Sequence, residues 1–212
     1  DVVACVPYVD IATAIEAAKG TNIKIGAENC HWAVSGAFTG EISPNMLVDA
    51  GVKYVIIGHS ERREYFGETD FTVNKKVVAA LEAGLHPIIC VGETLTQREL
   101  GVTMELIALQ LKSALAGVPA EKARKCVIAY EPVWAIGTGK VAGPDEVLAT
   151  HAVVRRLLCE RLGETGNRIP ILYGGSVKPA NAGNLIGLDN VDGLLIGGAS
   201  LDAQSFVQII RA

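Results

Sequence analysis

The sequence predicts an α/β fold with seven parallel strands, a (β/α)8 barrel that lacks its first βα unit. Short apolar runs of β-forming residues alternate with amphipathic segments from one end of the chain to the other. The runs are nearly continuous in apolar residues, which is typical of strands buried on both faces. Several runs end in glycine or in polar residues, and polar residues at successive strand ends are what the active-site face of a barrel requires.

The expected strands are seven runs of four or five residues: Val2–Cys5, Ile23–Ala27, Tyr54–Ile57, Pro87–Val91, Cys126–Tyr130, Ile169–Tyr173 and Gly193–Ile196. Three amphipathic segments between them predict helices at Thr72–Ala83, Thr103–Leu115 and Pro144–Leu162. The last begins with Pro-Asp-Glu, a favourable first helical turn, and is followed by a glycine.

An open, doubly wound sheet is the alternative to a barrel. No G-x-G-x-x-G motif follows the first strand, which disfavours dinucleotide binding. A closed barrel needs eight strands, and the chain begins without Met inside a strand-like run. We therefore expect one more βα unit before Asp1, and a single barrel domain over residues 1–212, since neither a linker nor a low-complexity tract interrupts the pattern.

The composition is that of an ordinary soluble globular protein, half hydrophobic, with 19 basic and 23 acidic residues and a net charge of -4. There is no basic stripe with interleaved aromatic residues, so nucleic acid is not an expected partner. No apolar run reaches the roughly 18 residues of a membrane span. The five cysteines are scattered and never spaced as C-x-x-C, which predicts reduced, buried thiols and a cytoplasmic location.

Glu131 is the first candidate for chemistry because it follows a buried strand directly. Pro132 ends the strand, and Gly137 and Gly139 permit unusual backbone angles farther along the loop. Trp134 and Ile136 are large apolar residues in a loop. This pattern predicts a hinged lid over a bound ligand with Glu131 as catalytic base. The alternative is a strand-capping glutamate in a structural loop.

His59 is the second candidate, at another strand end. Ser60 and Glu61 could begin a short helix there, and the partial positive charge of a helix N-terminus disfavours imidazolium. A neutral ring can still donate a hydrogen bond to a substrate. The alternative is a packed or solvated histidine, which is the interpretation we give to His31, His86 and His151.

The third candidate is a phosphate site split between two strand ends. The sequences Gly174-Gly175-Ser176 and Gly197-Gly198-Ala199-Ser200 follow the last two strands. Glycine allows the backbone to approach an anion, and N–H groups at a helix start point towards it. Barrels often bind phosphate at these last two loops. Two tight turns without a ligand are the alternative.

These motifs together resemble the triosephosphate isomerase family over the whole of residues 1–212. The resemblance is carried, in chain order, by the motifs G-H-S-E-R-R, Y-E-P-V-W-A-I-G-T-G-K, Y-G-G-S-V and L-I-G-G-A-S-L. The loop Ser35–Glu41 is also similar to the loop by which that family forms dimers, with Phe38 and Thr39 reaching the partner subunit. The resemblance implies a homodimeric enzyme of glycolysis and gluconeogenesis with a TIM barrel fold.

The resemblance also implies the roles of the site residues. Dihydroxyacetone phosphate and D-glyceraldehyde 3-phosphate would be interconverted through an enediolate, without cofactor or metal. Glu131 would be the base and neutral His59 the electrophile, with Glu61 in support. Ile136 and Leu195 would press on Glu131 from either side. Backbone N–H groups would hold the phosphate, at Gly137, Ser176, Gly197 and Gly198.

One departure keeps alternatives open. The family begins with a strand ending in an N-W-K-M-N-like motif that supplies an Asn and an electrophilic Lys, and no lysine of this chain matches it. An inactive or phosphate-binding fragment of the barrel is therefore an alternative. A metal-dependent sugar-phosphate epimerase is another, although it would need histidine partners at other strand ends, and His59 has none.

Overall fold

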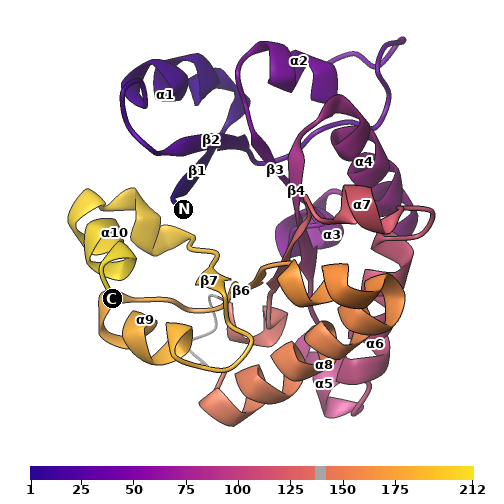
Figure 1. Ribbon diagram of the computed structural model, residues 1–212, viewed down its shortest axis with the longest axis vertical. Helices are drawn as coiled ribbons and strands as arrows, with labels where there is room; N and C mark the ends of the chain where they lie inside the picture. Colours follow the sequence, from indigo (N-terminus) through magenta and orange to yellow (C-terminus); the bar gives the residue numbers. More distant parts are fainter. Residues whose placement is uncertain (137–141) are drawn as a thin grey trace. The chain divides into compact units, whose positions relative to one another are not determined.

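The computed structural model describes residues 1–136 and 142–212, and these form two compact units (Figure 1). Unit 1 comprises Asp1–Ile89 and Ser113–Cys126, and unit 2 comprises Cys90–Lys112 and Val127–Ala212. Strands and helices alternate throughout the described residues, which confirms the predicted α/β class and the seven parallel strands. None of the helices in this part of the chain is both long and apolar enough to cross a membrane.

Unit 1 contains a parallel sheet whose strands pair in chain order. The strands are β1 (Val3–Val6), β2 (Lys24–Ala27), β3 (Tyr54–Ile57) and the first part of β4 (His86–Val91). The helices that follow or separate them are η1 (Tyr8–Asp10), α1 (Ile11–Ala17), α2 (Pro44–Asp49), α3 (Ser60–Tyr65), α4 (Asp70–Ala83) and α7 (Ala120–Ala123). Val55, Ile57, Val73 and Val77 are fully buried, so β3 and α4 share a core.

Unit 2 has the same alternation, with three parallel strands in chain order. They are β5 (Val127–Tyr130), β6 (Ile171–Tyr173) and β7 (Gly193–Leu194). The helices are α5 (Leu95–Glu99), α6 (Thr103–Ala114, whose last residues belong to unit 1), η2 (Val133–Ala135), α8 (Pro144–Leu162), η3 (Gly163–Arg168), α9 (Pro179–Ile186), η4 (Gly198–Leu201) and α10 (Ala203–Ile210). Ile128, Ile171 and Leu158 are fully buried, which places α8 on the strands of this unit.

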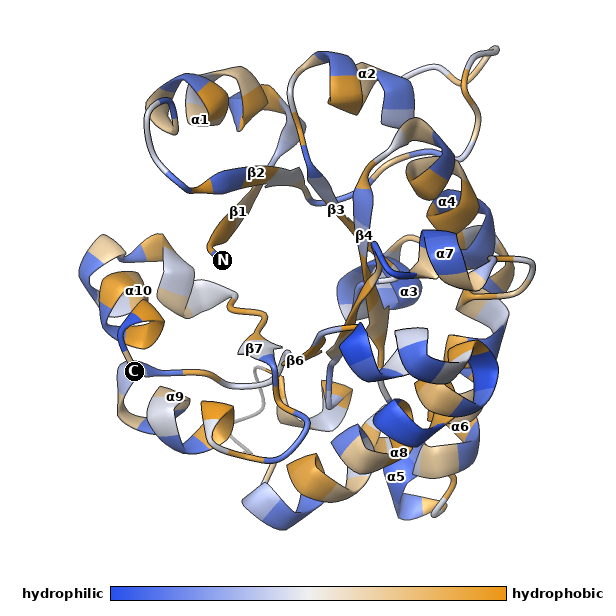
Figure 2. Cartoon of the chain, in the orientation of Figure 1, coloured by the Kyte–Doolittle hydropathy of each residue, from blue (hydrophilic) through white to orange (hydrophobic). Residues whose placement is uncertain are grey.

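The helix ends follow from local sequence chemistry. In α4 the Thr69 and Thr72 side chains each accept from the other's backbone N–H, and Gly84 ends the helix with φ +94°. In α8 Pro144 occupies the first turn and the Glu146 carboxylate accepts from the Gly143 N–H at 2.7 Å. All three predicted helices are confirmed, α8 with the bounds predicted. Figure 2 shows hydrophobic and hydrophilic residues alternating along α4 and α8, as one-sided burial requires.

The expectation that every strand is buried on both faces is wrong for two of them. All four residues of β1 and both residues of β7 are only half-buried, whereas three residues of β3 are buried. β1 pairs with β2 and β7 pairs with β6, and the two strands stand at the ends of the strand order. Apolar sequence alone does not tell a central strand from an end strand. β7 is also shorter than the predicted Gly193–Ile196.

Candidate active site

Glu131 lies directly after β5 and is only 2% exposed. Its N–H donates to the Val91 carbonyl at 2.8 Å, which extends the strand pattern one residue beyond β5. A Cβ atom at Gly174 would stand 3.1 Å from the Glu131 Cγ and 3.5 Å from Leu195 Cδ2. The side chains of Glu131 and Leu195 therefore border the same glycine. Glu131 follows β5, Gly174 follows β6 and Leu195 follows β7.

Gly92 holds the backbone of Glu131 from the other side. A Cβ atom at position 92 would stand 1.7 Å from the Glu131 carbonyl oxygen, so only glycine fits this approach. Both backbone groups of Gly92 bond to one side-chain amide: its N–H donates to Gln110 Oε1 at 2.8 Å, and Gln110 Nε2 donates to its carbonyl at 3.3 Å. Glycine at a strand end was noted in the sequence, but the role of Gln110 was not predicted.

Glu93 is a second buried carboxylate beside this strand end, with no exposed surface. Its Oε1 accepts from Trp134 Nε1 at 2.8 Å and from the Tyr130 hydroxyl at 3.2 Å, and Arg98 lies 3.3 Å away. Burial, and then the charge of Glu93, raise the pKa of Tyr130. The sequence showed Glu93 only as one of several polar strand ends. Its role could not be predicted from the sequence, because its hydrogen-bond partners Tyr130 and Trp134 lie 37 and 41 positions farther along the chain.

Trp134 does not stand free as part of a lid. It is buried in η2, bonded to Glu93, and the Arg98 guanidinium lies 4.3 Å from its ring centroid. Arg98 also pairs with Glu146 at the start of α8. Ile136 is half-buried and directly follows η2. The rest of the predicted lid, including Gly137 and Gly139, lies outside the described residues.

His59 belongs to unit 1, where it precedes α3 as its N-cap residue. Its Nδ1 accepts a hydrogen bond from the Glu61 N–H at 3.4 Å. A neutral ring whose Nδ1 keeps this accepting role would carry its proton on Nε2, the tautomer that can donate towards a substrate. The short helix predicted at Ser60 is confirmed. The Glu61 carboxylate lies 3.8 Å from the same Nδ1.

Other charges surround His59 within unit 1. The pKa of the Glu28 carboxyl is raised mainly by burial, while His59 lowers it and Glu61 raises it. Arg63 donates through Nε to the Gly58 carbonyl at 2.9 Å and pairs with Asp70 at 2.6 Å. These contacts fix the loop that carries His59.

The two Gly-Gly turns follow β6 and β7 as predicted. A Cβ atom at Gly175 would stand 2.2 Å from the Tyr173 hydroxyl, so this turn also requires glycine. The Ser176 carbonyl accepts from Asn181 Nδ2 at 3.0 Å, which ties the turn to α9. At Gly197 and Gly198 a Cβ atom would meet nothing within 4 Å, so space is open in front of this backbone. Three successive strand ends of unit 2 thus carry Glu131, Ser176 and the glycine pair.

The loop Ser35–Glu41 is exposed along its whole length. Phe38 is 44% exposed, although its ring lies 4.4 Å from the His31 ring, centroid to centroid. A Cβ atom at Gly36, where φ is +140°, would stand 2.7 Å from the Phe38 ring. Thr39 is exposed beside it. The loop therefore presents an aromatic side chain held by local contacts.

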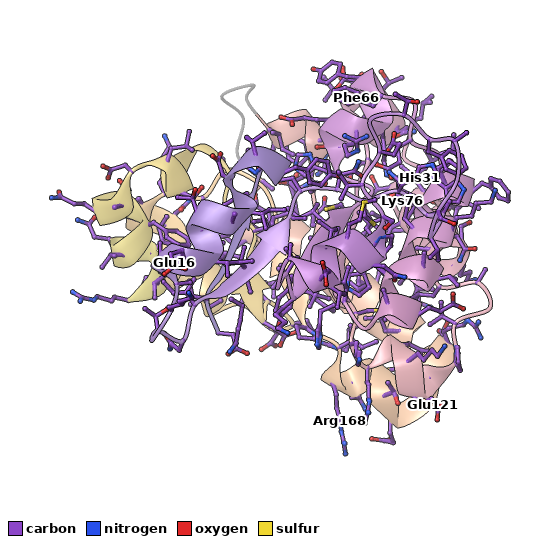
Figure 3. The ribbon with its side chains drawn as sticks, turned by 90° about the horizontal axis from the view of Figure 1, so that it is seen from above. Glu16, His31, Phe66, Lys76, Glu121 and Arg168 are labelled. Atoms are coloured by element: carbon purple, nitrogen blue, oxygen red, sulfur yellow. The ribbon has the colours of Figure 1, made fainter. Side chains whose placement is uncertain are left out.

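Unit 1 also buries a charged network. Lys76 pairs with Glu68 at 2.6 Å and donates to Asn29 Oδ1 at 2.8 Å, while Arg62 Nε lies 3.2 Å from Glu68. In Figure 3 Lys76 lies among interior side chains, whereas Phe66, over which Arg62 stacks, projects at the margin.

The remaining histidines and the thiols are packing residues. His31 stacks on Trp32, and His151 is fully buried with Nδ1 2.8 Å from the Asn190 carbonyl. None of the five cysteines is part of a disulfide, and Cys90 is fully buried. Burial raises the pKa of the Cys30 and Cys126 thiols to about 12. Within residues 1–136 and 142–212, no three His, Cys, Asp or Glu side chains are grouped as a metal site would need.

Comparison with known proteins points to one family. A family model described as Triosephosphate isomerase matches residues 1–212. Proteins named Triosephosphate isomerase from Acetivibrio thermocellus and Moorella thermoacetica are 55% and 53% identical to the whole chain, which spans 84% and 85% of their lengths. The crystal structure of triosephosphate isomerase from Bartonella henselae matches 98% of the chain and 84% of its own, with a TM-score of 0.91 and 44% identity.

Proposed function

The chain belongs to the triosephosphate isomerase family and is an isomerase of triose phosphates, and we propose that Glu131 is its catalytic base and His59 its electrophile. The reaction interconverts dihydroxyacetone phosphate and D-glyceraldehyde 3-phosphate. The observation that supports the proposal best is the position of Glu131. Its buried side chain borders Gly174, which Leu195 also approaches, and the three residues follow three consecutive strands, two of which lead into the glycine-rich turns.

The proposed chemistry is a proton transfer between neighbouring carbons. Glu131 removes a proton from the carbon next to the carbonyl, and the electron pair moves to the carbonyl oxygen, giving an enediolate. Returning the proton to the other carbon completes the isomerisation. The contact of the His59 Nδ1 with the Glu61 N–H supports a neutral ring that would donate from Nε2 to the developing oxyanion.

The phosphate would be held by backbone N–H groups at Ser176, Gly197 and Gly198. The absence of side chains at the two glycines leaves space for an anion, and the start of η4 offers N–H groups that have no partner within the helix. Gly137, assigned to the same role, lies outside the described residues. Leu195 supports the proposal as the apolar wall beside Glu131, and Ile136 and Glu61 are proposed to assist base and electrophile.

Assembly and location form a separate part of the proposal. We propose a homodimer in which the exposed loop Ser35–Glu41, with Phe38 and Thr39, inserts into the partner subunit. An exposed aromatic side chain held in place by Gly36 and His31 supports this, since it is prearranged for a contact. A cytoplasmic location is proposed because the thiols are reduced and the substrate belongs to glycolysis.

The decisive test is Glu131→Asp, which withdraws the carboxylate by one methylene. Small misplacements of a catalytic group cost on the order of 100-fold. We expect kcat to fall by about that factor in an isomerase assay, with KM little changed because the phosphate turns are untouched. Glu121→Asp, on the exposed α7, is the matched control and should keep parental kcat. Equal kcat for the two variants would remove Glu131 from the mechanism.

A further inference from the structure

Gln110 is a polar residue in a position that packing alone would give to an apolar side chain. It lies on the face of α6 that also presents Ile107, Leu111 and Ala114, all of them buried, and is itself 6% exposed. An amide buried without hydrogen bonds costs free energy, so such groups occur where they have partners. Met would fill the same volume without that cost. The reason for glutamine must therefore lie in what its amide contacts.

Both ends of the Gln110 amide contact one residue, Gly92. Oε1 accepts the Gly92 N–H at 2.8 Å and Nε2 donates to the Gly92 carbonyl at 3.3 Å. The amide thus supplies an acceptor for the N–H and a donor for the carbonyl, as a neighbouring strand would, at the residue that directly follows β4. Gln110 thereby fixes both the position and the plane of the backbone at residue 92.

The backbone at residue 92 in turn fixes the backbone of Glu131. The closest atom to a hypothetical Gly92 Cβ is the Glu131 carbonyl oxygen at 1.7 Å, and the Glu131 Cα is 3.3 Å away. On the preceding residue, the Val91 carbonyl accepts the Glu131 N–H at 2.8 Å. The strand end that Gln110 holds thus contacts the Glu131 backbone at its N–H and approaches it closely at its carbonyl oxygen.

We propose that Gln110 is a positioning residue for the catalytic base, acting through Gly92 on the backbone of Glu131. This rests on the proposed role of Glu131. The hydrogen bonds of the Gln110 side chain go to the Gly92 backbone, so its removal should affect the proton transfer more than substrate binding. A misplaced base lowers kcat, while contacts made equally to substrate and transition state set KM.

The test compares Gln110→Met, which keeps the volume and loses both hydrogen bonds, with Leu111→Met, which changes packing on the same helix face. We expect Gln110→Met to lower kcat at least 10-fold with KM within about twofold of the parent, since small displacements of a base are costly. Leu111→Met should keep kcat within about twofold at a similar melting temperature. Equal kcat values for the two variants would overturn the proposal.

A binding measurement separates positioning from general loosening. The probes are 2-phosphoglycolate, whose planar carboxylate resembles the enediolate, and glycerol 3-phosphate, which has the phosphate and two hydroxyl groups but no planar charged group. Gln110→Met should weaken the first at least fivefold more than the second. Equal weakening of both would contradict a positioning role. If Gln110→Met does not fold, Gln110→Glu serves instead, because it keeps the acceptor for the Gly92 N–H and loses the donor, and the same comparison applies.

Glu131→Gln, measured alongside, distinguishes the two levels of the proposal. If Glu131→Gln kept the kcat of the parent, the role of Glu131 itself would be overturned. Loss of activity in Glu131→Gln together with parental kcat in Gln110→Met would leave Glu131 as base and refute only the positioning role of Gln110.

Discussion

Replacing Gly92 by Ala tests how closely the strand end next to Glu131 determines the activity. The new Cβ atom would stand 1.7 Å from the Glu131 carbonyl oxygen, whereas real Cβ contacts stay above 3.0 Å. The two backbones must separate by about 1.3 Å, the difference between these distances. Neither atom belongs to a flexible side chain, so the displacement has to be taken up by the backbone that carries the base.

The expected loss follows from that displacement. Misplacing a catalytic group by about 1 Å costs on the order of 100-fold in rate, so we expect kcat of Gly92→Ala to fall at least that far. Overpacking a buried position also costs about 1–3 kcal/mol of stability, which for a chain of this length lowers Tm by several degrees. KM should change less than kcat, because the phosphate turns follow other strands.

The assay is steady-state isomerase kinetics together with thermal unfolding. Gly183→Ala is the matched control: Gly183 lies inside α9, and its new Cβ would approach no atom closer than 3.8 Å. Alanine is favoured over glycine in a helix by about 1 kcal/mol, so this variant should keep kcat and gain slightly in Tm. A Gly92→Ala protein with the kcat and Tm of the parent would show that the strand end yields without moving Glu131.

Two further predictions concern stability. Lys76→Met should cost about 3–5 kcal/mol in urea unfolding, because it leaves the buried Glu68 with Arg62 as its remaining described cation. Lys75→Met, at the half-buried position before it, removes only an ammonium that lies over the Phe71 and Trp32 rings and should cost less. Equal costs would refute the role of the buried pair. Burial lowers the pKa of His151 and His86 in the folded protein, so the unfolded chain binds more protons once the pH falls below about 6.5. Stability should therefore be fully present above that pH and decline below it. Between pH 7.5 and 5.0 the Tm of His151→Gln should fall less than the Tm of the parent. An equal fall in Tm for the two proteins would contradict this account.

The fold could be predicted from sequence because its signals are local. The strands at Tyr54–Ile57 and elsewhere are apolar runs that need no knowledge of their neighbours, and α8 begins at a proline and ends before a glycine. The half-buried state of β1 and β7 could not be predicted in this way, because it depends on which strand lies beside them. The position of a strand in a sheet depends on which strands pair with it, and an apolar run does not show whether it will have a neighbour on one side or on both.

The residues that carry the proposed chemistry were also readable in the sequence, since Glu131 and His59 stand at strand ends within recognisable motifs. The residues that hold them in place were not. Gln110 looks like an ordinary polar position of a helix, and Glu93 looks like one more polar strand end. Their roles arise from hydrogen bonds to residues 18 to 41 positions away. The sequence by itself determined the type of fold, the family and the candidate base, because these depend on local order and motif. The tertiary structure decided which glycine must be glycine and which buried amide positions the base, because those depend on atoms that only folding brings within 3 Å.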